Sequence, residues 1–295
     1  MILLPFVANL VLLVDLEVDR VVDISWNITA FESLVTDSRT KELIHALVTN
    51  QLAAEKATDL IAGKGNGLIM LLHGGPGTGK TFTAESVAEI AEKPLYRVTC
   101  GDIGTKPEEV EKYLESVLHL GKIWNCVVLL DEADIFLEER TLADLQRNAL
   151  VSTFLRALEY YSGILILTSN RVGHFDEAFK SRIQLALHYK NLDQRQRRQI
   201  WRNFLQRLKD LQEKDIDFTD LDKHIDDLAE NQMNGRQIRN AITTARQLAI
   251  YRKRDLDYQS LQDVIETSSM FDKYLLELNE GNSDDVIARG MGNRL

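Results

Sequence analysis

Residues 68–81 read Leu-Ile-Met-Leu-Leu-His-Gly-Gly-Pro-Gly-Thr-Gly-Lys-Thr, an apolar run that ends in a glycine-rich segment. From Gly74 onward the segment fits the spacing G-x-x-x-x-G-K-[ST], in which glycines leave room for backbone N–H groups to turn toward phosphate oxygens. In such a loop Lys80 would reach the β- and γ-phosphates, and the Thr81 hydroxyl would ligate Mg²⁺. The predicted nucleotide-binding residues are Gly74, Gly75, Pro76, Gly77, Thr78, Gly79, Lys80, Thr81 and Phe82.

The segments around this loop predict a doubly wound α/β domain with a parallel sheet. The apolar run Leu68–Leu72 is typical of a strand buried on both faces, and the helical pattern that begins near Thr81 would place phosphates at a helix N-terminus. Similar apolar runs and helical patterns alternate along the chain. The further predicted strands are Leu95–Thr99, Cys126–Leu130, Ile164–Thr168 and Ile183–His188, and the predicted helices are Thr81–Glu92, Glu108–Leu120 and Leu142–Tyr160, with another helical pattern from Ala30 to Ala62.

Two acidic residues follow the strand predicted at Cys126–Leu130. In parallel sheets ligands bind beyond the carboxyl ends of the strands, so Asp131 and Glu132 are expected at the edge that carries the phosphate loop. Asp131 suits the metal site because Mg²⁺ prefers oxygen ligands, and Glu132 suits the role of positioning and deprotonating the attacking water. Two acids at a strand end are also common helix caps, but their combination with the phosphate loop favours the catalytic interpretation.

The helical patterns after about residue 191 have no strand between them. They cover 193–212, 220–231, 235–253 and 258–279 and predict a second, smaller domain. The predicted organisation is an apolar N-terminal arm at 1–23, a phosphate-loop α/β domain at 24–190, a helical lid domain at 191–279 and a disordered tail at 280–295.

Composition excludes several classes of protein. With 35 Lys+Arg against 45 Asp+Glu, the net charge is −10, which argues against a generally basic surface that binds nucleic acid. Cys100 and Cys126 cannot form a disulfide framework or a tetrahedral zinc site, and they are compatible with an intracellular protein. The apolar stretch at 2–14 is too short to span a bilayer and is interrupted by Pro5 and Asn9, so a membrane partner is not expected.

A family resemblance emerges from the segments that follow. The strand predicted at Ile164–Thr168 ends in Ser169-Asn170-Arg171, and residues 176–182 read Asp-Glu-Ala-Phe-Lys-Ser-Arg. Together with the phosphate loop and the acid pair, their order resembles the AAA family of ATPases within the larger AAA+ group, over about residues 24–276. The chain is most similar to uncharacterised AAA ATPases of filamentous fungi.

The resemblance implies roles for further polar residues. Asn170 matches the residue that senses the γ-phosphate and orients the water, and Arg182 matches the arginine finger that a subunit supplies to its neighbour's nucleotide. The family's second arginine is absent beyond Arg182, which makes this segment more similar to that of clamp loaders. In the lid, the segment 234–240 faces the nucleotide, and Arg239 is preferred over Arg236 as its contact with the γ-phosphate. The pore loop of threading members would be reduced here to Ile103-Gly104.

The resemblance implies an ATPase that uses ATP and Mg²⁺ and couples hydrolysis to remodelling of a protein or complex. Because Arg182 would act in trans, a homo-oligomeric ring is expected, a hexamer by family resemblance. Two alternatives remain open. One is a clamp-loader-like ATPase acting on DNA, which the acidic composition disfavours. The other is an ATP-binding scaffold with little turnover, which the intact set of Lys80, Asp131, Glu132 and Asn170 disfavours. A small-molecule kinase would lack the acid pair combined with a helical lid.

Overall fold

A computed structural model describes residues 23–56, 67–99, 107–137, 145–171 and 175–278 of the chain. Nearly all of the predicted arm, the whole of the predicted tail and the predicted pore loop at Ile103-Gly104 lie outside these residues. The sheet has five parallel strands in the order β2-β3-β4-β1-β5. Its strands are β1 (Leu68–Gly74), β2 (Leu95–Thr99), β3 (Val127–Asp131), β4 (Ile164–Ser169) and β5 (Leu185–Tyr189).

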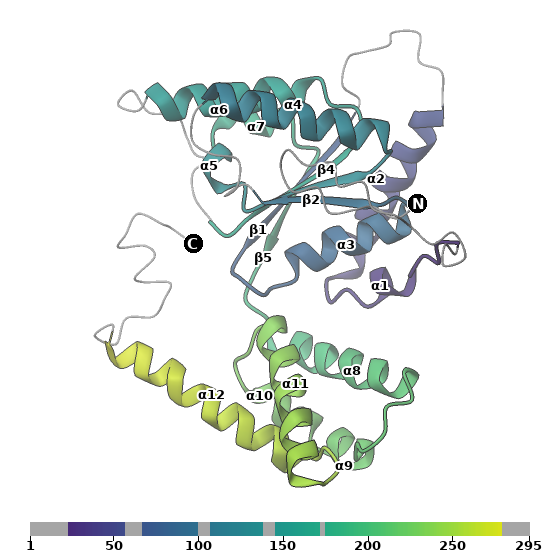
Figure 1. Ribbon diagram of the computed structural model, residues 1–295, viewed down its shortest axis with the longest axis vertical. Helices are drawn as coiled ribbons and strands as arrows, with labels where there is room; N and C mark the ends of the chain where they lie inside the picture. The colour runs from purple at the N-terminus through teal and green to yellow at the C-terminus, as the bar shows by residue number, and fades with distance from the viewer. Residues whose placement is uncertain (1–22, 57–66, 100–106, 138–144, 172–174, 279–295) are drawn as a thin grey trace, which may run out of the picture.

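Helices cover both faces of this sheet, as Figure 1 shows. Alternate residues of β1 point to opposite faces, so Ile69 and Leu71 join one apolar core while Met70 and Leu72 join the other. The first core includes residues of α4 (Pro107–Ile123), α5 (Asp134–Leu137), α6 (Leu145–Glu159) and α7 (Glu177–Lys180), and the second includes residues of α1 (Thr29–Glu32), α2 (Ser38–Lys56) and α3 (Lys80–Ile90). The prediction of a doubly wound α/β domain is therefore confirmed.

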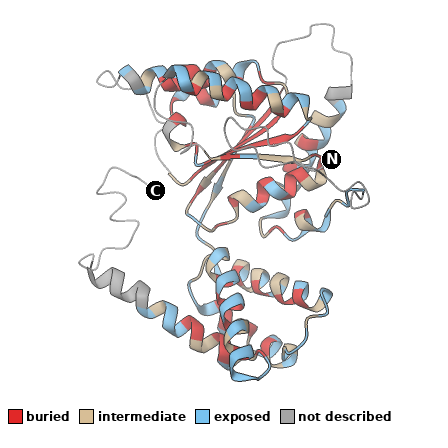
Figure 2. Cartoon of the chain, in the orientation of Figure 1, coloured by how far each residue is buried: buried red, intermediate tan, exposed pale blue. Residues whose placement is uncertain are grey.

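The three inner strands explain why the sequence shows unbroken apolar runs. Every residue of β3 and β4 is buried, and in β1 only His73 is partly exposed. Figure 2 shows this burial along the middle of the sheet. The edge strand β5 begins two residues later than predicted, because the backbone N–H of Ile183 donates to the Phe179 carbonyl and closes the turn after α7.

The helical pattern predicted from Ala30 to Ala62 is divided into α1 and α2. The Asp37 carboxylate accepts hydrogen bonds from the backbone N–H of Thr40 at 2.8 Å and from its hydroxyl at 2.6 Å. Such a side chain satisfies a backbone donor that a helix leaves open at its start, and it therefore fixes a new helix beginning at Ser38.

A separate helical lid follows the sheet and has its own apolar core around the fully buried Trp201. Asp193 and Asn234 form capping boxes that begin two of its helices. The helix predicted at 220–231 is two short helices that meet at His224. The lid helices are α8 (Gln194–Asp210), α9 (Phe218–Lys223), α10 (Ile225–Glu230), α11 (Gly235–Arg252) and α12 (Tyr258–Leu278). Among the described helices, none is both long and apolar enough to cross a membrane.

Arg197 of α8 is a buried arginine. It belongs to the basic run Arg195-Gln196-Arg197-Arg198, a pattern that predicts a solvated helix face or a subunit contact, but Arg197 is buried one helical turn before Trp201. Its guanidinium donates to the carbonyl oxygens of Leu192 at 2.6 Å and Ala229 at 2.8 Å. The expectation is wrong for this residue, because Arg197 joins the segment that enters the lid to the end of α10.

We predict that Arg197→Met lowers the free energy of unfolding by about 2 kcal/mol, because buried carbonyl groups lose their donor. The matched control is Arg195→Met, which removes an exposed arginine from the same helix and should change stability by less than about 0.5 kcal/mol. Urea unfolding followed by circular dichroism measures both. Equal stability of the two variants would contradict the structural role of Arg197.

Candidate active site

The glycine-rich loop lies between β1 and α3, and three of its glycines, Gly74, Gly77 and Gly79, have a positive φ. Gly74 has a φ of +142°, and a Cβ added there would lie 2.1 Å from the Tyr189 carbonyl oxygen of β5. Gly79 caps α3 with a φ of 108°, and a Cβ added there would meet no atom within 4 Å. The loop is therefore packed against the sheet at its start and open at its end, where the N–H groups of α3 begin.

Lys80 is the buried cation of this loop, with a relative exposure of 6%. Its Nζ donates to the carbonyl oxygens of Gly74 and Gly75, each at 2.7 Å. Burial lowers the pKa of the ammonium to about 8, although the charges of Asp134 and Asp131 act in the opposite direction. Of the next two predicted nucleotide-binding residues, Thr81 is half-buried, whereas the side chain of Phe82 is exposed.

Asp131 ends β3 and is held by both of its carboxylate oxygens. Oδ1 accepts a hydrogen bond from the Thr168 hydroxyl at 2.5 Å, and Oδ2 pairs with the Arg97 guanidinium at 2.5 Å. The Thr168 oxygen also accepts from the backbone N–H of Glu132 at 3.0 Å. Glu132 has a left-handed φ of 59° and an exposed side chain, so the chain turns sharply between the two acids.

Asn170 follows β4 and is positioned through its backbone by Asp134. One oxygen of Asp134 accepts from the Ser169 hydroxyl at 2.5 Å and from the backbone N–H groups of Asn170 at 3.2 Å and Arg171 at 3.4 Å. The sequence pattern indicates no role for Asp134, although this residue lies only three positions after Asp131. Asp134 thus links the segment after β3, which carries the acidic residues, to the end of β4, which carries Asn170.

These strand ends converge at one edge of the sheet. In the sheet order β4 lies between β3 and β1, so Asp131, Asn170 and the phosphate loop follow three neighbouring strands. The charges of Asp131, Asp134 and Glu132 all act on Lys80. A cation, three carboxylates and the open N-terminus of α3 therefore share one site.

The donor set supplies part of the oxygen ligands that Mg²⁺ requires. Thr81 and Asp131 would supply hard oxygen ligands, which this cation prefers. Among the described residues, no group of three or more His, Cys, Asp or Glu side chains could hold a metal ion. A metal at this site would take its remaining ligands from phosphate oxygens or water.

Arg182 is held outside this cluster by residues of its own chain. It follows α7, and Nη1 donates to the Ala178 carbonyl at 2.9 Å. Nη2 donates to Glu159 at the end of α6 at 3.2 Å, with the Arg182 side chain 26% exposed. Among the described residues, Arg182 is not one of the charges that shift the pKa of Lys80.

The lid contacts the phosphate loop directly. The backbone N–H of Gly235, the first residue of α11, donates to the Gly77 carbonyl at 2.9 Å. A Cβ added to Gly77 would lie 2.4 Å from the Asn234 Oδ1. Figure 1 shows the turn between β1 and α3 facing the start of α11. Of the two lid arginines, Arg236 acts on the pKa of Lys80, whereas Arg239 acts on the pKa of Glu85 in α3.

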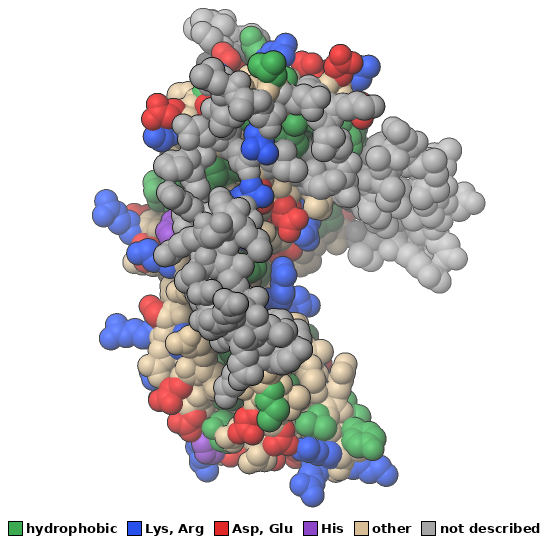
Figure 3. Space-filling view, turned by 90° about the vertical axis from the view of Figure 1, so that its left-hand side faces the viewer, with side chains coloured by type: hydrophobic (Ala, Val, Ile, Leu, Met, Phe, Trp, Pro, Cys, Tyr) green, Lys and Arg blue, Asp and Glu red, His purple; other side chains and the backbone are tan. Residues whose placement is uncertain are grey.

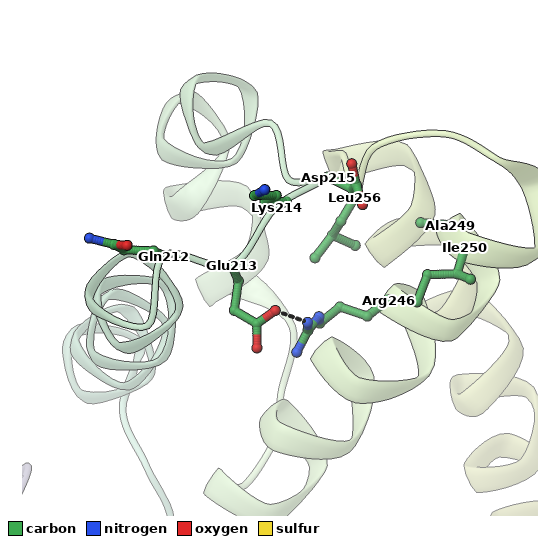
Figure 4. Close-up of a pocket in the computed structure, with 8 residues that line it drawn as sticks. All are labelled: Gln212, Glu213, Lys214, Asp215, Arg246, Ala249, Ile250 and Leu256. Atoms are coloured by element: carbon green, nitrogen blue, oxygen red, sulfur yellow. Dashed lines mark hydrogen bonds and ion pairs between the residues drawn. The ribbon is translucent and has the colours of Figure 1, made fainter.

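A separate hollow lies within the lid and includes none of the predicted site residues. Its volume is about 390 Å³, and an ion pair between Glu213 and Arg246 at 2.7 Å crosses it (Figure 4). On the face drawn in Figure 3, the described residues present both Lys and Arg and Asp and Glu side chains. Neither feature competes with the sheet edge as a candidate active site.

We predict that the affinity for metal-free ATP falls as the pH rises above about 8. Between this pKa and its ordinary value of 10.5, Lys80 is neutral in the free protein, whereas bound phosphates favour its charged form. Binding therefore takes up a proton in this window, and the affinity falls by up to about tenfold per pH unit.

Calorimetric titrations in buffers of different ionisation enthalpy measure both the affinity and the proton uptake. Lys80→Arg is the matched control, because a guanidinium stays charged and should remove the pH dependence. A wild-type affinity that stays constant across pH 8 would contradict the prediction.

Comparison with known proteins adds to this geometry. Residues 70–191 match the family model described as ATPase family associated with various cellular activities (AAA), and residues 192–282 match that of the fungal AAA+ ATPase lid domain. The chain is 28% identical over 178 residues to ATPase family AAA domain-containing protein 3B of Homo sapiens, covering 56% of this chain and 28% of that protein. It is 30% identical over 141 residues to Lon protease of Mycolicibacterium smegmatis, covering 39% and 18%.

The chain thus spans less than a third of the length of these relatives. The two family matches are contiguous, and the boundary between them lies between the end of β5 and the start of α8. Together with the phosphate loop, the acid pair and the lid seated on the loop, these matches show that the chain belongs to the AAA family of ATPases.

Proposed function

We propose that this AAA ATPase hydrolyses ATP in a Mg²⁺-dependent reaction and couples hydrolysis to remodelling of a protein or protein complex. The observation that carries the proposal is the hydrogen bond from Gly235 of the lid to Gly77 of the phosphate loop. Because the lid is fixed to the loop that would hold the phosphates, a change at the γ-phosphate has a direct route to the lid. Motion of a rigid lid relative to the sheet is a common way to convert ligand changes into shape changes.

The proposed mechanism assigns one task to each residue of the sheet edge. Lys80 and the loop N–H groups bind the β- and γ-phosphates, while Thr81 and Asp131 would hold Mg²⁺, which offsets the charge of the phosphates when bound. Glu132 accepts a proton from the attacking water. Asn170 orients that water, and its backbone is held for this purpose by Asp134.

The lid contributes an arginine to the same site. The sequence favours Arg239, whereas Arg236 is the one of the two whose charge acts on the pKa of Lys80. Both side chains are exposed, so either could turn toward bound nucleotide. We therefore propose Arg236, in addition to Arg239, as a candidate for the lid residue that contacts the γ-phosphate.

Arg182 is proposed to act on the nucleotide of a neighbouring subunit. In its own chain it is paired with Glu159 and lies apart from the charges around Lys80. A guanidinium supplied in trans would stabilise the charge that develops on the γ-phosphoryl oxygens. This role requires a ring, for which we propose a hexamer of identical subunits.

A protein is the proposed substrate rather than nucleic acid. The acidic composition argues against a generally basic surface, and the face drawn in Figure 3 shows both acidic and basic side chains among the described residues. One relative of the chain is named a Lon protease, and a protease acts on proteins. The clamp-loader and scaffold alternatives have no comparable support from the described residues.

We predict that mixing two inactive variants restores ATP hydrolysis. Glu132→Gln lacks the base but retains Arg182, whereas Arg182→Ala retains its own base, so a mixed interface can contain one complete site. Random mixing of equal amounts of the two variants would place one complete site at about a quarter of the interfaces. Steady-state phosphate release measures the recovery.

The control for mixing is the double variant Glu132→Gln/Arg182→Ala, which cannot supply Arg182 and should rescue nothing. Full activity of Arg182→Ala alone, or no recovery on mixing, would contradict an arginine that acts in trans. A wild-type protein that does not hydrolyse ATP would contradict the proposed function.

A further inference from the structure

Arg97 is a cation that lies beside Asp131, the proposed metal ligand. The proposed mechanism gives Arg97 no role. In the parallel pair of β2 and β3, Thr99 lies opposite Asp131 and Arg97 opposite Leu129, so the side chains of Arg97 and Asp131 share one face of the sheet. The Arg97 Nη2 lies 2.5 Å from Asp131 Oδ2, and the other carboxylate oxygen accepts from Thr168. Both oxygens of the proposed metal ligand are thus already engaged.

The same guanidinium also acts on the helix that carries the second proposed ligand. Arg97 and Asp131 both influence the pKa of Glu85 on α3, so these three charges lie near one another. Glu85 is one helical turn after Thr81 and lies on the same side of α3. Arg97 therefore lies beside Asp131 and near enough to α3 for its charge to act on Glu85.

The ion pair between Arg97 and Asp131 contributes little to the stability of the fold. The Arg97 side chain is 54% exposed, whereas that of Asp131 is 9% exposed. Half-exposed ion pairs contribute little to folding, because water screens them and the long side chain loses conformational freedom. The pair matters instead because Asp131 is buried. Without the charge of Arg97, this carboxylate and the nearby Glu132 and Asp134 would attract a divalent cation.

We propose that Arg97 is a positioning residue that acts as the protein's own counter-ion for Asp131. It keeps the site from binding a free divalent cation, so that the metal enters only together with the phosphates of the nucleotide. The charge of the triphosphate outweighs that of one guanidinium, and the remaining lone pairs of Asp131 can still accept from metal-bound water. This inference rests on the proposed function, which assigns Asp131 to the metal.

Binding of free Mn²⁺ in the absence of nucleotide, measured by electron paramagnetic resonance, tests the proposal. We expect weak binding by the wild type and about tenfold tighter binding by Arg97→Gln, because a unit charge some 6 Å from a divalent ion in a water-like dielectric contributes about this factor. Arg97→Lys retains the charge and should bind Mn²⁺ as weakly as the wild type.

Two further variants separate a local effect from a change in net charge. Arg156→Gln removes an arginine that pairs with Glu111 on the helical face, at 3.4 Å, and should leave Mn²⁺ binding unchanged. The double variant Arg97→Gln/Asp131→Asn should lose the gain of Arg97→Gln. Circular dichroism of each variant verifies that the fold is retained.

The outcomes distinguish this inference from the proposed function. Equal Mn²⁺ affinity of wild type and a folded Arg97→Gln would overturn the counter-ion role, and so would a gain that persists in the double variant. In the presence of ATP, Mn²⁺ binding that is unaffected by Asp131→Asn would instead overturn the assignment of Asp131 to the metal. A gain in Arg97→Gln that requires Asp131 supports the proposal.

Discussion

Parallel pairing of β3, β4 and β1 is the constraint on which the site depends. The register places Leu130 opposite Leu167 and Ser169 opposite His73, so the three strands end at the same edge. The Thr168 hydroxyl then joins two of these ends, because it donates to Asp131 and accepts from the backbone of Glu132. A shift of one residue in this register would turn the acids to the other face, and the phosphate loop would face no carboxylate.

The site also depends on the way helix α11 of the lid begins. Asn234 and Gln237 form a capping box, which fixes the first residue of α11 and orients its free N–H groups. One of these groups, that of Gly235, has no partner within the helix and donates to Gly77 of the loop. The contact joins two units with separate apolar cores through a few polar groups, and such a joint can open without disturbing either core.

The sequence predicted the features that depend on local spacing and missed those that depend on pairing between distant segments. The glycine-rich loop, the acid pair and the apolar strands are local patterns, and the α/β fold with its helical lid followed from them. The contacts of Arg97 with Asp131 and of Asp134 with the backbone of Asn170 arise only from the register of neighbouring strands. The burial of Arg197 was missed for a related reason, since its partners are carbonyl groups of segments that no side-chain pattern reveals.

Equilibrium binding of a non-hydrolysable ATP analogue with Mg²⁺ tests most directly the central claim that residues 74–81 hold nucleotide phosphates at this sheet edge. The account predicts one site per chain and a loss of affinity of about a hundredfold in Lys80→Ala, because the buried ammonium would make charge-assisted hydrogen bonds to the phosphates. Circular dichroism establishes that the variant is folded. A wild type that binds no nucleotide, or a folded Lys80→Ala that binds it as tightly as the wild type, would contradict the account.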